Sequence, residues 1–299
     1  MDGVSTAQER LPLGVVTVTY SPGPHLAALL DSLPADTVTV LADNGSVDGA
    51  PEAAAAARPN VRLLPTGGNI GYGAAANRGI AELARMRDAG RIRGDRVLLV
   101  NPDVVFAPGA LAALDECARR NPRAAAVGPL IREPDGGVYP SARAVPELRS
   151  GTGHALLSGI WPGNPWSARY RAEADHSRER DAGWLSGSCL LLDWAAFDAV
   201  GGFDERYFMY FEDVDLGDRL GRAGWRNVYC PAAEIRHAQG HSATRHRERT
   251  VRAHHDSAYR FLADRLPGWW RAPLRAALRA GLALRASAVL ARARRRNDG

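Results

Sequence analysis

The sequence contains no lysine, because all 38 of its basic residues are arginine. This absence excludes every mechanism in which a lysine amine is the reactive group. A Schiff-base lysine, an attachment point for pyridoxal phosphate and the lysine of a P-loop are therefore impossible in this chain.

Cysteine is scarce, with only three residues. Cys117, Cys189 and Cys230 are far apart in the sequence and show no metal-ligand spacing, so we expect reduced thiols in a cytoplasmic protein. Residues 1–14 lack the basic and apolar regions of a signal peptide, so we expect no secretion.

Charge is distributed unevenly. Residues 1–235 carry 23 arginines and 29 acidic residues, whereas residues 236–299 carry 15 arginines and 4 acidic residues. The pI near 9.4 therefore describes mainly the tail. The acidic excess of the larger part would repel a nucleic-acid backbone, and no nucleic-acid-binding motif occurs, so we expect no nucleic-acid partner.

The tail lacks an uninterrupted apolar run. Residues 273–291 approach membrane-spanning length, but three arginines interrupt them, and each would cost about 2.5–3.5 kcal/mol at a bilayer centre. We therefore expect residues 246–299 to form a basic amphipathic helical region on the inner face of the cell membrane, with Trp269 and Trp270 at headgroup depth. The alternative is a pair of helices that packs on the preceding domain. We expect that preceding domain to span residues 11–245.

Strands and helices alternate in the first half of the chain. β-rich runs at residues 15–20, 37–42, 61–64 and 97–100 are separated by helical patterns, which is the βαβ succession of a parallel sheet. The sequence therefore predicts an α/β fold with a Rossmann-like, mostly parallel central sheet flanked by helices. The glycines of residues 67–73 do not match GxGxxG, which disfavours a dinucleotide site.

The strand at 97–100 ends abruptly at Asn101-Pro102-Asp103. Pro102 cannot donate a hydrogen bond to a neighbouring strand, so the strand must stop there. Asn101 and Asp103 then lie at the carboxyl end of a parallel strand, where open α/β sheets bind ligands. An ordinary Asx or proline turn is the alternative interpretation.

Residues 133–181 break the alternation of strands and helices. They contain several prolines and glycines and two tryptophans. An irregular insertion of this length is functional or disordered, and the tryptophans favour a lid or docking loop. Residues 184–192 return to the pattern of one strand, in which Gly187 and Ser188 leave room either for a ligand or for a tight packing contact.

An acidic cluster begins a helix at residue 212. Glu212, Asp213 and Asp215 suit a helix N-terminus through capping and the helix dipole, but three carboxylates in four positions exceed what capping needs. Aromatic residues at 207–211 precede them and form a suitable wall for a sugar. A carboxylate at this place is a candidate general base that removes a hydroxyl proton.

Together these motifs resemble glycosyltransferase family 2, which comprises inverting enzymes of the GT-A fold that use nucleotide-sugars. The resemblance covers about residues 14–245. The matching segments, in family order, are VVTVTYSP, ADNGSVDG, GGNIGYGAAANRGI, LLVNPDVVF, WLSGSCLLL, GGFDERYFMYFEDVDLGDRLGRAGW and IRH. The resemblance implies a nucleotide-diphospho-sugar transferase domain with a C-terminal helical extension.

The resemblance also implies a role for individual residues. Asp213 matches the catalytic base that deprotonates the acceptor hydroxyl. Asp103 and His237 match the ligands of a divalent metal, Mn²⁺ or Mg²⁺, that stabilises the leaving nucleotide. Asp43 matches the residue that binds N3 of the pyrimidine. The donor nucleotide-sugar side comprises Tyr20, Asp43, Asn69, Arg78, Asn101 and Asp103. The acceptor side comprises Trp184, Gly187, Ser188 and Glu212.

Asn101 departs from the family's DxD motif, because it places a neutral amide where many members have a carboxylate. We therefore expect either a weaker affinity for the metal or a metal that is less essential to the reaction. NPD, together with DNGS and EDVDL, resembles the rhamnosyltransferase branch of actinobacteria, whose donor is dTDP-L-rhamnose and whose acceptor is GlcNAc linked to polyprenyl diphosphate in the cell-wall linker. We therefore expect the chain to transfer L-rhamnose from this donor to this acceptor, as an enzyme bound peripherally to the membrane. A homodimer is compatible with the sequence. The alternatives are a family 2 enzyme that uses UDP-hexose or UDP-galactofuranose, and an inactive protein that binds sugar nucleotides.

Overall fold

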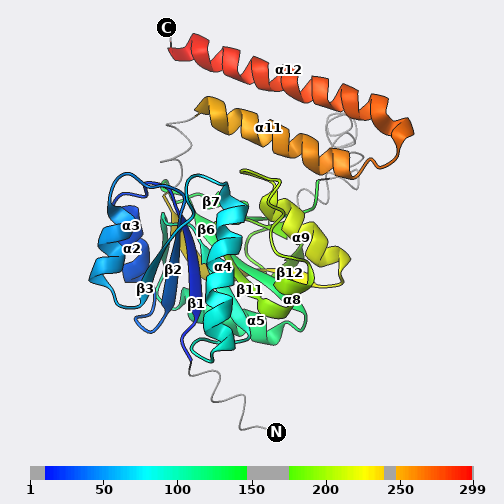
Figure 1. The fold of residues 1–299 in the computed structure, drawn as a ribbon. Coiled ribbons are helices and arrows are strands. Elements are labelled where there is room, and N and C mark those ends of the chain that lie inside the picture. Colours follow the sequence, from blue (N-terminus) through cyan, green and yellow to red (C-terminus); the bar gives the residue numbers. More distant parts are fainter. Residues whose placement is uncertain (1–10, 147–174, 239–246, 298–299) are drawn as a thin grey trace.

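The structure, a computed structural model, describes residues 11–146, 175–238 and 247–297. Within these ranges the main sheet has ten strands, in the order β3-β2-β1-β4-β11-β6-β12-β5, with β7 beside β6 and β9 beside β12 (Figure 1). The strands are β1 (Gly14–Thr19), β2 (Val38–Asp43), β3 (Val61–Pro65), β4 (Arg96–Val100), β5 (Val104–Phe106), β6 (Ala124–Arg132), β7 (Val138–Tyr139), β9 (Arg180–Ala182), β11 (Cys189–Asp193) and β12 (Arg226–His237). A separate pair is formed by β8 (Ala142–Arg143) and β10 (Trp184–Leu185).

Helices cover both faces of this sheet. One face carries α2 (His25–Ser32), α3 (Ala50–Ala57) and α5 (Ala110–Arg120), and the other carries α4 (Tyr72–Asp88), α8 (Trp194–Ala199) and α9 (Glu212–Arg222). Each face of the sheet has its own hydrophobic core. Leu29 of α2 and Leu114 of α5 lie in the core of the first face, whereas Ile80 of α4 and Leu216 of α9 lie in the core of the second face. Apolar helix faces and strands without alternation thus produce three layers, as predicted.

The sheet is mostly parallel. Strands β1 to β4 are mutually parallel in the order β3-β2-β1-β4. The next strand, β11, is antiparallel to both of its neighbours, β4 and β6. Strands β6 and β12, which are parallel to each other, therefore again run in the direction of β1. The sequence patterns give no sign of the reversal at β11, because a buried strand reads the same in either direction.

The chain leaves β4 at Pro102, as predicted. β5 does not continue β4 but pairs with β12 at the far edge of the sheet, where Val104 lies opposite His237. The prediction of one strand over residues 184–192 is wrong. Leu185 of β10 pairs with Ala142 of β8, and the chain joins the main sheet only at Cys189 of β11. Residues 186–188 between them turn toward the acidic cluster.

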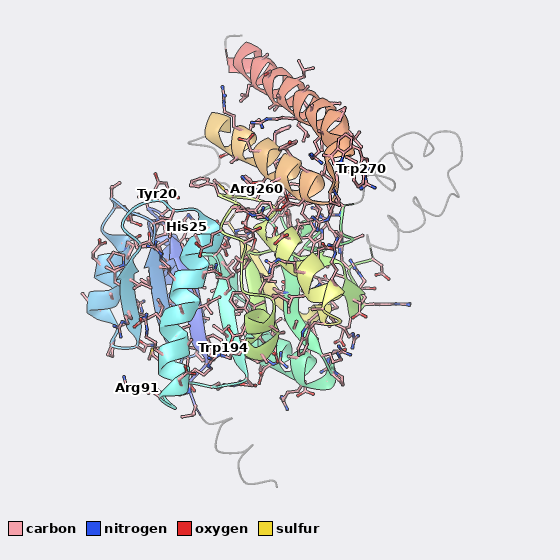
Figure 2. All side chains as sticks on the ribbon, turned by 45° about the vertical axis from the view of Figure 1, so that its right-hand side comes forward. Tyr20, His25, Arg91, Trp194, Arg260 and Trp270 are labelled. Atoms are coloured by element: carbon pink, nitrogen blue, oxygen red, sulfur yellow. The ribbon has the colours of Figure 1, made fainter. Side chains whose placement is uncertain are left out.

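Two long helices end the described chain, α11 (Arg247–Asp264) and α12 (Ala272–Asn297), joined by the short 3-10 helix η1 (Trp269–Arg271). Figure 1 shows α11 lying across the sheet end at which β1 terminates, with α12 on its outer side. Tyr20 and His25 lie at this end and Trp194 at the opposite end (Figure 2). None of the described helices combines the length and apolarity that crossing a membrane requires.

Two predicted features fall outside the described ranges. The domain boundary at residue 245 lies in the gap at 239–246, and most of the predicted insertion lies in the gap at 147–174. The rest of the insertion contributes the short strands β7, β8 and β9. The division into two domains stays a prediction.

Candidate active site

Asp43 lies at the carboxyl end of β2 and is buried. Its carboxylate accepts hydrogen bonds from the Thr19 hydroxyl at 2.8 Å and from the Ser46 amide at 3.1 Å. A third donor is the Gly45 amide, at 3.2 Å. These bonds close the turn after β2 and fix the carboxylate at the edge of the sheet. Tyr20, the residue that follows β1, is exposed beside this end.

Two further donor-side candidates hold the loop between β3 and α4. The guanidinium of Arg78 donates to the carbonyl of Thr66 at 2.6 Å, and the side-chain oxygen of Asn69 accepts from the Gly71 amide at 3.2 Å. Gly71 has a φ of +96°, and a Cβ at this position would lie 2.6 Å from the carbonyl oxygen of Phe208. Another part of the chain therefore makes the close approach that this glycine permits.

Asn101, Asp103 and His237 meet although 134 residues separate the last two. A carboxylate oxygen of Asp103 lies 2.9 Å from Nε2 of His237, and the side-chain amide nitrogen of Asn101 lies 3.4 Å from the same Nε2 atom. Among the described residues, the buried Oδ1 of Asn101 and Nδ1 of His237 have no hydrogen-bond partner. A cavity of about 660 Å³ borders Asp103 and His237. The group offers oxygen and imidazole ligands to a cation at the edge of an accessible space.

Asp213 is held by backbone amides. One carboxylate oxygen accepts from the Gly187 amide at 2.9 Å and the other from the Val214 amide at 2.8 Å. The neighbouring Glu212 is buried, and its Oε2 has no partner in the described part of the chain.

The two carboxyls of this pair lie in different environments. Burial raises the pKa of both carboxyls, and the charge of Asp213 raises the pKa of Glu212 further. The hydrogen bonds from the amides of Gly187 and Val214 oppose this rise at Asp213, whereas at Glu212 only its own backbone amide does so. The two amide hydrogen bonds therefore favour the charged form of Asp213, whereas burial beside that charge favours the protonated form of Glu212.

The backbone directly before this pair is strained. Tyr210 and Phe211 have φ values of +67° and +68°, and each such residue costs about 1–2 kcal/mol when it is not glycine. Two consecutive aromatic residues in this conformation persist only when surrounding structure holds them.

Gly187 and Ser188 connect the acidic pair to the group formed by Asn101, Asp103 and His237. The Ser188 carbonyl accepts a hydrogen bond from the backbone amide of Asn101 at 2.9 Å, while the backbone amide of Gly187 donates to Asp213. The hydroxyl of Tyr72 donates to the Gly187 carbonyl at 2.8 Å, so both polar groups of the Gly187 backbone are held. Sequence reasoning missed Tyr72, because its position after Gly71 does not reveal that it reaches residue 187.

Trp184 lies in packing rather than in an open wall. It is buried with Tyr207, Val214 and Phe261, and its indole nitrogen donates to the Ala144 carbonyl at 3.0 Å. Gly187 bonds to Asp213 directly, and Ser188 and Glu212 adjoin these two residues in the chain, whereas Trp184 packs against Val214 of α9. The acceptor-side roles of these residues stay predictions.

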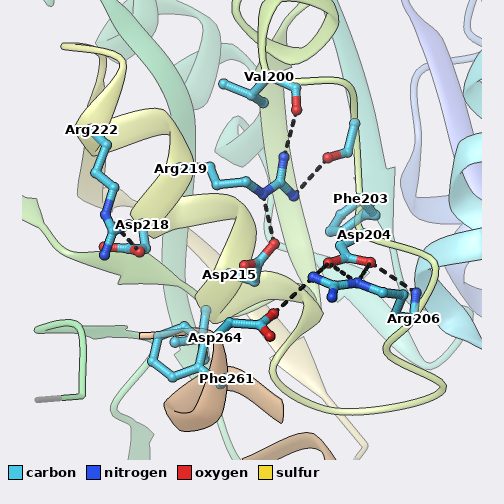
Figure 3. Close-up of polar contacts among 12 residues, drawn as sticks. Val200, Phe203, Asp204, Arg206, Asp215, Asp218, Arg219, Arg222, Phe261 and Asp264 are labelled. Carbon is cyan, nitrogen blue, oxygen red and sulfur yellow. Dashed lines mark hydrogen bonds and ion pairs between the residues drawn. The ribbon is translucent and has the colours of Figure 1, made fainter. Parts of the chain in front are cut away.

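Asp215, the third carboxylate of the acidic cluster, is bound by arginine (Figure 3). Arg219 donates to it at 2.7 Å and also to the carbonyls of Val200 at 2.7 Å and Gly202 at 2.8 Å. This network fastens α9 to the segment after α8. Glu212 and Asp213 are therefore the two members of the cluster that suit proton transfer.

The structure also gathers two of the three cysteines. Sulfur and carboxylate atoms of Cys117, Cys230 and Glu179 lie within 4.8 Å of one another, although their sequence spacing predicts no such group. Arg120 and Asn121 donate to the two oxygens of Glu179 at 2.8 and 2.7 Å. These donors already satisfy the carboxylate, so the cluster is explained by packing at the start of β9.

The sequence and fold match known proteins. The family model described as glycosyltransferase like family 2 matches residues 6–254. The N-acetylglucosaminyl-diphospho-decaprenol L-rhamnosyltransferase of Mycobacterium tuberculosis is 57% identical over 291 residues, which cover 95% of each chain.

Two solved structures share the fold. The mannosyltransferase PcManGT from Pyrobaculum calidifontis, in complex with GDP-Man and Mn²⁺, has a TM-score of 0.55 and 18% identity, over 96% of this chain and 80% of that one. GalNAc-T7 with UDP, GalNAc and Mn²⁺ has a TM-score of 0.54 and 15% identity, over 77% of this chain and 43% of that one. Both are too distant in sequence to support more than the fold. On the family match and the extent of the mycobacterial identity, the chain belongs to glycosyltransferase family 2 and is a glycosyltransferase of GT-A fold.

Proposed function

We propose that this enzyme transfers L-rhamnose, with inversion, from dTDP-L-rhamnose to GlcNAc linked to polyprenyl diphosphate, in synthesis of a cell-wall linker. The observation that supports this most strongly is the 57% identity with the mycobacterial rhamnosyltransferase. The shared region covers 95% of both chains, so it includes the donor side, the acceptor side and the C-terminal helices.

Asp213 is the general base of the proposed reaction. Its carboxylate is fixed by the amides of Gly187 and Val214, so it does not need to reorganise when it accepts the proton of the acceptor hydroxyl. The deprotonated oxygen attacks the anomeric carbon as the diphosphate leaves from the opposite face. One displacement without a covalent intermediate inverts that centre.

Asp103 and His237 are the proposed protein ligands of a divalent cation, with Asn101 beside them. The fit rests on the adjacent Asp103 oxygen and His237 nitrogen and on the buried Asn101 oxygen, which lacks a partner among the described residues. Imidazole favours Mn²⁺ over Mg²⁺. When bound, such a cation neutralises the charge of the leaving diphosphate.

The donor nucleotide is assigned to the loops at the carboxyl ends of β1 and β2. Asp43, which is fixed there, is assigned to the pyrimidine, and the exposed ring of Tyr20 lies beside the same edge. Asn69 and Arg78 shape the neighbouring loop through backbone contacts. The acceptor sugar is assigned to the side of Gly187, Ser188 and Glu212, supported by Trp184.

We also propose that α12 rests on the membrane that holds the acceptor. Trp269 and Trp270 are 83% and 64% exposed, and Leu274 and Leu284 are exposed as well. Exposed tryptophans beside many arginines are typical of a helix that lies at an anionic lipid surface. Placing α12 there would bring the carboxyl-end edge of the sheet toward the lipid-linked acceptor (Figure 1).

The test is transfer from a panel of nucleotide-sugars to a GlcNAc-diphosphoryl lipid with Mn²⁺ or Mg²⁺. The proposal expects a rhamnosylated lipid from dTDP-L-rhamnose alone. Selective use of a UDP-hexose or UDP-galactofuranose would refute the rhamnosyl assignment and keep the glycosyltransferase. Asp213→Asn is the matched negative control, because it keeps the shape of the side chain.

A further inference from the structure

Helix α11 contacts the strained turn at Tyr210 and Phe211, which precedes the acidic pair of Glu212 and Asp213. The hydroxyl of Ser257 donates to the carbonyl of Met209 at 3.0 Å. The ring centroid of Phe261 lies 5.5 Å from that of Phe211. Both Ser257 and Phe261 are buried. α11 therefore holds the turn on both sides of Tyr210.

The same helix contacts the chain after the pair. Val214, which follows Asp213, is buried against Phe261 in a cluster that also contains Trp184. One turn further, Asp218 of α9 forms an ion pair with Arg265, the residue that directly follows α11. Four residues before Tyr210, Arg206 donates to Asp264 of α11 at 2.8 Å (Figure 3).

We propose that α11 positions the base of the reaction, so that the C-terminal extension is part of the catalytic apparatus. This inference rests on Asp213 as the base proposed above. Positive φ values at two aromatic residues relax unless neighbours hold them, and α11 supplies contacts on both sides of the pair. Because Asp213 follows the turn within two residues, relaxation of the turn would displace its carboxylate. A displacement of about 1 Å costs about 100-fold in rate.

The experiment compares Phe261→Ala with Leu114→Ala in the full chain. Both variants remove a fully buried apolar side chain, but Leu114 lies on α5, in the core of the opposite sheet face. Both should lower the melting temperature. Only Phe261→Ala should lower kcat, by about 100-fold, with the Kd for dTDP within about twofold of wild type, and Phe261→Leu should restore part of the rate.

Amide hydrogen exchange supplies a readout that does not depend on turnover. Peptides covering residues 207–216 should exchange faster in Phe261→Ala and at the wild-type rate in Leu114→Ala. Equal kcat losses in the two variants, or unchanged exchange in Phe261→Ala, would overturn the inference. If Phe261→Ala does not fold, Ser257→Ala provides the same comparison, with Ser257→Thr as the variant that retains the hydroxyl. A wild-type chain that transfers no sugar would refute the proposed function, while the exchange comparison would still decide this inference.

Discussion

Glu212→Gln should stabilise the protein at alkaline pH. The Glu212 side chain is buried beside Asp213, and within the described residues nothing hydrogen-bonds its Oε2. Burial, followed by the charge of Asp213, raises the pKa of Glu212 from 4.5 to about 8. The folded state therefore binds this proton more tightly than the unfolded state does. Its contribution to stability is complete below pH 4.5 and is lost as the pH rises through 8.

Glutamine resembles the protonated carboxyl and stays neutral at every pH, so the variant does not lose this contribution. At about 1.4 kcal/mol per pKa unit, the interval between 4.5 and 8 gives about 5 kcal/mol as an upper bound on the difference in unfolding free energy. We expect about 3 kcal/mol at pH 9, because rearrangement and water entry relieve part of the cost of a buried charge.

The assay is urea unfolding of both proteins at pH 5, 7 and 9 and constant ionic strength, followed by tryptophan fluorescence. Glu52→Gln is the control, because Glu52 is exposed in the first turn of α3 and its replacement should shift the curves equally at all three pH values. If the difference between Glu212→Gln and wild type does not grow with pH, Glu212 is not a proton-holding carboxyl and the division of roles within the pair is wrong.

Three further outcomes are expected. Asp213→Asn should lower the rate of transfer by about 10²–10⁴ in a single-turnover assay while leaving the Kd of dTDP nearly unchanged; an equal loss of donor affinity would contradict its role as base. Asp103→Ala should abolish the Mn²⁺-dependent part of donor binding in calorimetry, and a titration that matches wild type would exclude it as a metal ligand. Replacing Trp269 and Trp270 with serine should reduce cosedimentation with vesicles that contain anionic lipid, whereas full cosedimentation would place the membrane contact elsewhere in the chain.

Local chemistry made much of the fold predictable. Pro102 ends β4 because it has no amide hydrogen, and this fixed where Asn101 and Asp103 would lie. Apolar runs identified the parallel strands, since such strands are buried on both faces. The meeting of Asp103 with His237 was expected only through the resemblance to a family, because no local pattern links residues so far apart.

Contacts between distant residues were not predictable. The sequence from 184 to 192 reads as one strand, but the Gly187 amide bonds to Asp213 and interrupts it. Tyr72 binds Gly187 from α4, and Ser257 binds Met209 from α11. Each of these bonds depends on how separate layers stack, which patterns of three to seven residues do not encode.

The pairing of β5 with β12 has a consequence for synthesis on the ribosome. Asp103 emerges 134 residues before its neighbour His237. At a translation rate of about 5–20 residues per second, this delay lasts about 7–27 s. During that time β1 to β4 are complete, whereas β5 lacks the strand beside which it lies. A nascent chain therefore has both halves of the Asp103–His237 group only when nearly all of the catalytic sheet has been made, so products of premature termination contain the first strands without that group.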